Sequence, residues 1–205
     1  MWLAAIWRYP VKSMAGEALS TAELTADGIL GDRLLFVRDA TERVITARTF
    51  PRLLGHRAIV GPDGGPLVDG RPWTSSAVAA DVVAAAGPGA RLTRAEGRRR
   101  FDILPLLVAT DGAIAAFGRD GRRLRPNLII GGVPGLAERT WERGTLAVGS
   151  ALIALADLRQ RCVMTTRPES PFYSTSFAST HHRRPQRGQS TSTPASPWKS
   201  AARSL

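Results

Sequence analysis

A single cysteine, Cys162, stands in the segment Arg161-Cys162-Val163-Met164-Thr165-Thr166. A lone thiol cannot form a disulfide within its chain, so the chemistry open to it is to bind a metal or to attack an electrophile. Both reactions need the thiolate, which the neighbouring Arg161 would stabilise. The alternative is a small buried hydrophobic residue, the commoner fate of a free cysteine, and the local sequence by itself favours this alternative.

Lysine is nearly absent from the chain. Only Lys12 and Lys199 occur, and the other 26 of the 28 basic residues are arginine. In Tyr9-Pro10-Val11-Lys12-Ser13, backbone amides, a hydroxyl and an ammonium group could converge on an anion such as phosphate, for which a compact point charge is suited. An ordinary strand end, with the lysine kept by chance, is the simpler explanation of this segment taken alone.

Other arginines stand where strands are expected to end. Gly31-Asp32-Arg33 and Thr46-Ala47-Arg48 each place an arginine at a strand edge, where it would contact phosphate or face water. In Arg125-Pro126-Asn127, the proline favours an extended Arg125 and could aim Arg125 and Asn127 in set directions. None of these segments is decisive singly.

Composition excludes several other chemistries. His56 is the only histidine before the C-terminal tail, so with one cysteine no Cys/His zinc cluster can form. The chain has no Gly-x-Gly-x-x-Gly segment that opens a helix and no Walker loop. Its aspartates at positions 32, 102 and 111 lack a spacing that argues for paired-carboxylate catalysis.

The chain has 205 residues, of which 43% are hydrophobic, enough to bury the core of one domain or two small ones. We expect no signal peptide, no membrane helix and a reducing cytoplasm. The net charge is +11, but residues 167–205 contribute +5 of it. The densest cluster before them, residues 94–100, is short and poor in aromatic residues, which favours a solvated face or phosphate contacts over nucleic-acid binding.

Short strands are predicted over residues 2–9, 18–24, 33–38, 43–47 and 57–60, a pattern typical of a small barrel or sandwich. A helix is predicted over 77–86, with an N-cap within 74–76 and a stop at Gly87-Pro88. A strand at 104–108 is expected to lead into a second helix, 113–117, capped by Thr110 or Asp111. Further strands are predicted at 127–130, 140–141, 146–148, 152–156 and 162–165, followed by a tail whose composition predicts disorder.

Taken together in this order, six segments resemble the MOSC family, named for the C-terminal domain of molybdenum cofactor sulfurase, with its preceding N-terminal β-barrel domain. The segments, which span nearly all of residues 1–166, are Ile6 to Ser13, Gly31-Asp32-Arg33, Thr46-Ala47-Arg48 with Pro51-Arg52-Leu53, Arg123 to Leu128, Trp141 with Val148-Gly149, and Arg161 to Thr166. The resemblance implies a mainly β fold with a few helices (α+β). Its parts would be an N-terminal β-barrel domain over 1–71, an incomplete MOSC β-barrel domain over 72–166 and a disordered basic Ser/Pro/Arg tail over 167–205.

By this resemblance the cofactor is a molybdopterin-type molybdenum cofactor, and Cys162 is the catalytic residue whose thiolate binds the metal. The residues that would hold the pterin and its phosphate, or line their site, are Lys12, Ser13, Arg33, Arg48, Thr110, Arg125, Asn127 and Arg161. Asp111 departs from the small hydroxyl residue that relatives place there, and its charge would repel the phosphate. The family also carries an association with pyridoxal phosphate binding.

The resemblance further implies an oxidoreductase that reduces N-hydroxylated small molecules by two-electron removal of oxygen. Electrons would come from a separate redox protein, because the chain has no ferredoxin cysteines. We expect neither a membrane nor a nucleic acid as partner. Two alternatives stay open: a non-catalytic carrier of the cofactor or its sulfur, and an inactive family member, because residues 167–205 lack the family's usual ending and would leave an unpaired barrel edge.

Overall fold

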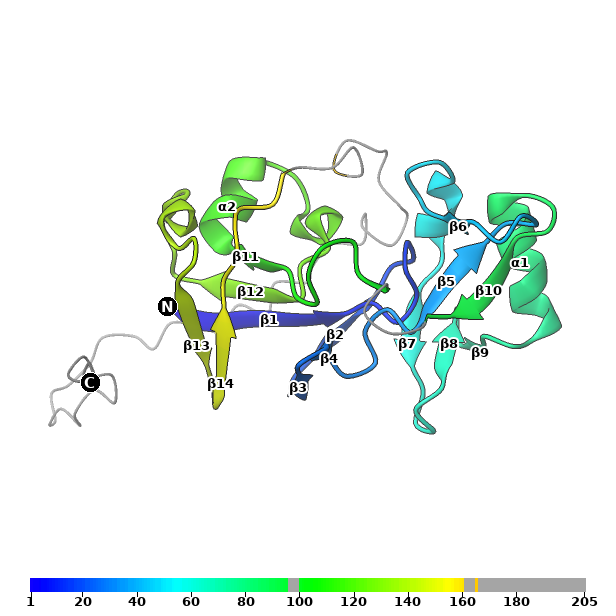
Figure 1. Cartoon of the computed structure of the whole chain (residues 1–205), viewed down its shortest axis with the longest axis horizontal. Coiled ribbons are helices and arrows are strands. Elements are labelled where there is room, and N and C mark those ends of the chain that lie inside the picture. The colour runs from blue at the N-terminus through cyan, green and yellow to red at the C-terminus, as the bar shows by residue number, and fades with distance from the viewer. Residues whose placement is uncertain (96–99, 161–164, 166–205) are drawn as a thin grey trace, which may run out of the picture.

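The computed structural model describes residues 1–95, 100–160 and 165, and this part of the chain is built mainly from strands with two α-helices. This confirms the predicted fold class, mainly β with a few helices. Figure 1 shows two groups of elements, one around each helix, with β1 (Trp2–Arg8) reaching from the group around α2 to the centre of the molecule.

The α1 region comprises β5 to β10, the short 3₁₀-helix η1 (Pro51–Gly55) and α1 (Ser76–Ala86). Its first sheet has the order β10-β5-β6, in which β5 (Leu35–Arg38) pairs antiparallel with β10 (Arg91–Arg94) and β6 (Val44–Ile45). Its second sheet joins β7 (Ala58–Val60), β8 (Pro66–Val68) and β9 (Arg71–Pro72) in an antiparallel meander. The α1 region therefore presents short strands on which a helix can pack.

The helix α1 begins and ends where its sequence signals predict. Ser75 Oγ accepts a hydrogen bond from Val78 N at 3.3 Å, and Gly87 ends the helix with a φ of 94°. Val78 and Val82 face inward and are buried in a continuous core. The members of this core are Val11, Met14, Leu35, Val37, Ala47, Leu53, Leu54, Ala58, Val68, Val78, Val82, Ala85, Ala86 and Ala90.

The α2 region comprises β1 to β4, β11 to β14 and α2 (Asp111–Phe117). Its main sheet has the order β11-β12-β1-β2, with β11 (Val108–Thr110) parallel to β12 (Leu128–Gly131) and β1 antiparallel to both β12 and β2 (Glu17–Leu19). Two hairpins complete it: β3 (Leu24–Thr25) with β4 (Gly28–Ile29), and β13 (Thr145–Val148) with β14 (Ala151–Ala154). The buried apolar cluster here is small and consists of Ile6, Ile29 and Leu128.

Some predicted elements are wrong in type or position. The strand predicted at 140–141 is the end of a 3₁₀-helix, η4 (Ala137–Thr140), in which Thr140 Oγ1 donates to the backbone oxygen of Ala137 at 2.9 Å. The strand predicted at 104–108 begins only at Val108, because Pro105 lacks the N–H that a ladder needs. Strands β4, β8, β9 and β10 were not predicted, and the prediction for 162–165 lies outside the described residues except for Thr165.

Packing does not follow the predicted division of the chain at residue 71. The elements α1 and β10 come after this position but pack in the α1 region, whereas β1 comes before it and pairs with β12. The predicted domains 1–71 and 72–166 stay predictions, and the predicted tail 167–205 lies outside the described residues. Within the described ranges, neither α-helix has the length and apolar character needed to cross a bilayer.

Candidate functional site

A cavity of about 590 Å³ draws its walls from both regions. It is large enough for a cofactor-sized molecule. Of the site residues predicted from the sequence, those that line it are Lys12, Ser13, Arg33, Arg48, Arg125 and Asn127. Thr110 is buried beside the cavity without lining it, and Arg161 and Cys162 lie outside the described residues. Chain segments far apart in sequence thus contribute to one concave surface.

Three of the lining residues have a left-handed backbone. The φ angles of Ser13, Arg33 and Arg125 are 74°, 51° and 55°, a region that residues other than glycine rarely adopt. The extended backbone predicted for Arg125 from the proline after it is therefore wrong. Left-handed conformations persist only where the surroundings enforce them, and they concentrate at functional sites. All three residues line the cavity.

Tyr9 holds two of the cavity's arginines. Its ring is 1% exposed, and the guanidinium carbons of Arg125 and Arg33 lie 4.2 Å and 5.4 Å from the ring centroid. Contacts of this kind are attractive because the ring face is electron-rich. The Tyr9 hydroxyl donates to the backbone oxygen of Pro126 at 3.2 Å, which ties the ring to the segment that carries Arg125.

Arg125 is only partly satisfied by the protein. Its Nη1 donates to the backbone oxygen of Met14 at 2.6 Å. Its Nη2 is buried and has no hydrogen-bond partner within the part of the chain that the structure describes. A buried donor left without an acceptor is costly, so this atom marks a place where an acceptor from a ligand would fit.

Asp32 is the buried counter-ion of the cluster. It is fully buried, forms an ion pair with Arg33 and accepts a hydrogen bond from Tyr9 N at 2.7 Å. Its other oxygen accepts from Asn127 Nδ2 at 3.2 Å. Asp32 therefore neutralises Arg33 and fixes both residues, although the sequence did not single it out for that role.

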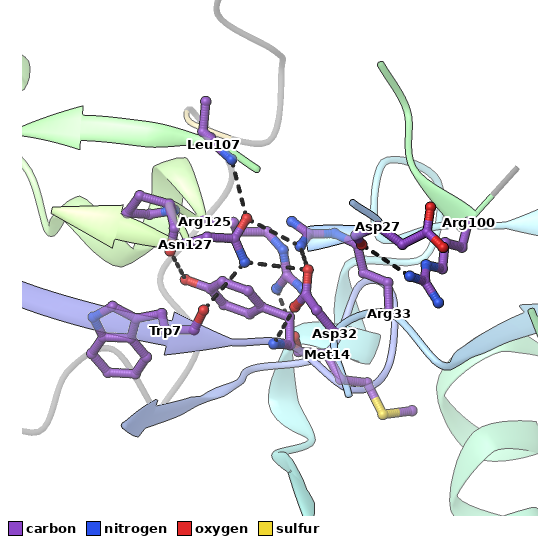
Figure 2. A network of polar contacts seen from close by, with 11 residues as sticks. Trp7, Met14, Asp27, Asp32, Arg33, Arg100, Leu107, Arg125 and Asn127 are labelled. Atoms are coloured by element: carbon purple, nitrogen blue, oxygen red, sulfur yellow. Dashed lines mark hydrogen bonds and ion pairs between the residues drawn. The ribbon is translucent and has the colours of Figure 1, made fainter. Parts of the chain in front are cut away.

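Asn127 joins β1 to the segment between β4 and β5 and to the segment that leads into β11. Its Nδ2 also donates to the backbone oxygen of Trp7 at 3.2 Å, and its Oδ1 accepts from Leu107 N at 3.1 Å. Figure 2 shows this amide at the centre of the polar network, between β1 and the segments that carry Asp32 and Leu107. The side chain is fully buried, so it acts as a hub of the cavity wall and is itself held on both of its polar atoms.

Lys12 meets a carboxylate that the sequence analysis did not connect with it. Its Nζ lies 2.8 Å from Asp102 Oδ1, while Arg48 and Arg159 lie 3.7 Å and 3.4 Å from Asp102 Oδ2. Partial burial raises the pKa of Asp102, but the hydrogen bond and charge of Lys12 and the charges of Arg48 and Arg159 outweigh it, so the pKa lies below its ordinary value. This carboxylate is thus charged at neutral pH.

Thr110 and Asp111 stand at the N-terminus of α2 and fix it by hydrogen bonds. Thr110 Oγ1 accepts from Ala113 N at 2.9 Å as the helix N-cap and donates to Glu138 Oε2 at 3.0 Å. Asp111 accepts from the backbone amides of Val133 at 3.0 Å and Gly132 at 2.6 Å, which lowers its pKa. Asp111 is not part of the cavity lining, so the repulsion expected between its charge and a phosphate is not supported.

The described lining is strongly cationic. Seven of its residues are lysine or arginine and two are acidic, Asp102 and Glu138. Sequence reasoning missed Arg123, Arg139 and Arg159 among them; Arg123 is 7% exposed, and its Nε donates to the backbone oxygen of Thr165 at 3.2 Å. Apolar side chains complete the wall, including Leu104, Leu107, Val108 and Leu136. Within residues 1–95, 100–160 and 165, no group of three or more His, Cys, Asp or Glu residues is arranged to hold a metal ion.

Comparison with known proteins bears on the first part of the chain. Residues 1–76 match the family model described as the MOSC N-terminal beta barrel domain. Mitochondrial amidoxime reducing component 2 of Macaca fascicularis is 24% identical over 222 residues, which cover 80% of this chain and 66% of that protein. These two matches confirm the predicted resemblance to MOSC proteins and to amidoxime-reducing proteins.

Residues 1–76, which match this model, supply Lys12, Ser13, Arg33 and Arg48 to the cavity, and the chain after residue 76 supplies Arg125 and Asn127. The lining fits an anionic ligand with an extended apolar or aromatic body, because cationic groups stand beside an apolar wall and Arg125 Nη2 has no acceptor among the described residues. A phosphorylated pterin has this character.

Proposed function

We propose that the chain binds a molybdopterin-type molybdenum cofactor in this cavity and acts as an oxidoreductase that reduces N-hydroxylated small molecules. The observation that carries the proposal is the convergence of six predicted residues, from the stretch that matches the MOSC N-terminal model and from the chain after it, on one cationic cavity. The buried Nη2 of Arg125 in its wall adds a donor that has no acceptor in the part of the chain that the structure describes.

Lys12, Arg33 and Arg125 would bind the phosphate and the polar edge of the pterin, and the Ser13 and Asn127 segments would shape the wall around it. The cation–π contacts of Tyr9 and the ion pair of Asp32 already hold Arg33 and Arg125 in place. Little side-chain entropy is then lost when the ligand arrives, which favours tight binding. Asn127, satisfied on both polar atoms, would position the wall and would not contact the ligand itself.

Cys162 is the proposed metal ligand and catalytic residue. It lies outside the described residues, but its sequence neighbours Gln160 and Thr165 both line the cavity. Arg161 beside it would favour the thiolate over the thiol. Bound there, the cofactor would supply two-electron removal of oxygen from the substrate, while the protein supplies position, charge and a partly dry pocket.

The remaining parts of the proposal concern partners. The substrate is a small N-hydroxylated molecule, such as an amidoxime, admitted beside the apolar wall of Leu104, Leu107 and Leu136. Electrons come from a separate redox protein, and the cytoplasm is the proposed location. Pyridoxal phosphate stays an association of the family, and we do not assign it to this cavity.

The test is to purify the whole chain from a molybdenum-replete host and to measure molybdenum and pterin together. We expect wild type to hold both in equal amounts, Cys162→Ala to lose molybdenum, and Arg125→Met to lose both. Arg71→Met is the matched control, because Arg71 pairs with Asp81 beside α1 and does not line the cavity.

Equal molybdenum in wild type and Cys162→Ala would remove Cys162 from its proposed role. Molybdenum without any reduction of an aryl amidoxime by reduced viologen would instead identify the chain as a cofactor carrier. A wild-type chain that holds neither molybdenum nor pterin would overturn the proposal as a whole.

A further inference from the structure

The feature that the proposed function leaves unexplained is a carboxylate in the middle of the cavity's cations. Asp102 lines the cavity, and its two oxygens face Lys12, Arg48 and Arg159 at distances of 2.8 to 3.7 Å. Three cations around one carboxylate leave an excess of positive charge at this point. The arrangement resembles the coordination that a phosphate group receives from basic side chains.

The segment that carries Asp102 is anchored on its N-terminal side. Phe101 is 9% exposed, and Arg100 donates to the backbone oxygen of Asp27 at 2.9 Å, as Figure 2 shows. Arg100 also covers the Phe101 ring, at 4.8 Å from its centroid. Asp102 is therefore presented to the cations by a fixed neighbour, while Ile103, the next residue, is 70% exposed.

We propose that Asp102 is a resident counter-anion, which occupies the place of a ligand phosphate between Lys12, Arg48 and Arg159 and is displaced when that phosphate binds. This inference rests on the proposed function, because it names how the same cavity is regulated and which ligands it admits. The side chain of Asp102 is 40% exposed, so it can turn into water and recover its hydration without crossing the protein interior.

The exchange favours ligands with two negative charges. A monoanion that replaces Asp102 is attracted by the three cations about as strongly as the carboxylate was, so the exchange brings little net electrostatic energy. A phosphate ester or pyrophosphate brings a second charge and further acceptor oxygens to the same three cations. Asp102 thus pairs with the cations while no ligand is bound, and it discriminates against chloride, carboxylates and other singly charged anions.

The test uses calorimetric titration, with pyrophosphate, of the whole chain purified from a host that makes no molybdenum cofactor, so that the cavity is free of it. A resident group that occupies the binding position about nine-tenths of the time lowers the apparent affinity of the ligand about tenfold. If Asp102 has this effect, Asp102→Asn should bind pyrophosphate about tenfold more tightly than wild type. Asp81→Asn is the matched control: it removes the same charge from an ion-paired carboxylate of similar exposure, 37%, which does not line the cavity. Asp102→Glu keeps the charge and should not gain affinity as Asp102→Asn does.

A second measurement follows the reactivity of Lys12 and does not require a binding constant. Lys12 and Lys199 are the only lysines, so acylation of each can be followed by mass spectrometry with Lys199 as internal reference. We expect Asp102→Asn to acylate faster at Lys12 than wild type, and pyrophosphate to restore protection.

Equal or weaker pyrophosphate binding by Asp102→Asn would overturn the inference, as would unchanged acylation of Lys12. Absence of pyrophosphate binding in both proteins would overturn it as well. None of these outcomes depends on molybdenum, and a wild-type chain that holds none after purification from a molybdenum-replete host would count against the proposed function alone.

Discussion

The two regions of the molecule differ in how much of their apolar surface they bury by themselves. The α1 region surrounds one continuous core, and the buried face of α1 supplies Val78 and Val82 to it. The buried apolar cluster of the α2 region has only three members, and none of the residues of α2 itself is buried. In β14, Leu152 is 77% exposed.

The difference indicates that the two regions are stabilised in different ways. Because hydrophobic burial is the main favourable contribution to folding, we expect the α1 region to owe most of its stability to this core. The α2 region is held mostly by the pairing of β2 and β12 with β1 and by the polar network around Asn127. Most of the cavity lining comes from residues after position 76. We therefore expect mutations in the two regions to have unequal effects on stability.

The largest effect is expected in the core of the α1 region. Leu35 is fully buried in β5, and Leu35→Ala should lower the free energy of unfolding by about 3 kcal/mol, through lost burial and the cavity left behind. Leu152→Ala in β14 is the matched control and should change it by less than about 0.5 kcal/mol. Urea unfolding followed by tryptophan fluorescence measures both, and similar losses for the two would contradict the comparison.

The next effect is expected at Asn127, in the polar network of the α2 region. Asn127→Ala leaves Leu107 N without its acceptor and removes one of the donors to the buried Asp32, which should cost about 2 kcal/mol. Because these contacts hold the α2 region, we also expect calorimetric unfolding to broaden, with the α2 region melting first. A single sharp transition at the wild-type temperature would show that this network does not stabilise the α2 region.

A smaller effect is expected at the start of α1. Ser75→Ala removes the N-cap, and a loss of about 1 kcal/mol is typical of such a change. Ser76→Ala is the control, because Ser76 is exposed at the first position of the helix and is not its N-cap. A destabilisation by Ser76→Ala as large as that by Ser75→Ala would mean that Ser75 Oγ is not the cap.

The smallest effect is a pH dependence in the turn between β5 and β6. The hydrogen bond from Thr41, opposed in part by burial and supported by backbone amides and the charge of Arg43, lowers the pKa of Asp39 from 3.8 to about 2. The charged Asp39 carboxylate therefore stabilises the folded protein fully above the pKa that it has in the unfolded chain. This stabilisation is lost as the pH falls through the lower pKa of Asp39 in the folded protein. Asp39→Asn should flatten the acid side of a plot of urea midpoint against pH, and curves that stay parallel would contradict this.

Local signals in the sequence predicted what is locally determined. Ser75 and Gly87 mark the ends of α1, and Thr110 caps α2, because a cap is a contact between residues three positions apart. Pairing between distant strands leaves no such mark, so β10 was missed and the strand expected at 140–141 is a 3₁₀-helix.

The same reasoning explains which site residues were found. Lys12, Arg33 and Arg125 stand in segments that the family resemblance covers, and the structure places all three on one cavity. Asp102 and Arg159 stand outside those segments, and only the fold brings them beside Lys12. Cys162 lies outside the described residues, so its role stays a proposal.

The left-handed residues Ser13, Arg33 and Arg125 set a limit on how this protein can be made more heat-resistant. A search for stabilising substitutions would select glycine at these positions, because glycine adopts such φ angles without steric penalty. Each replacement would relax the main chain and at the same time remove a side chain from the cavity wall. Selection for thermostability alone would therefore erode ligand recognition first, and an engineered variant should keep these three positions unchanged.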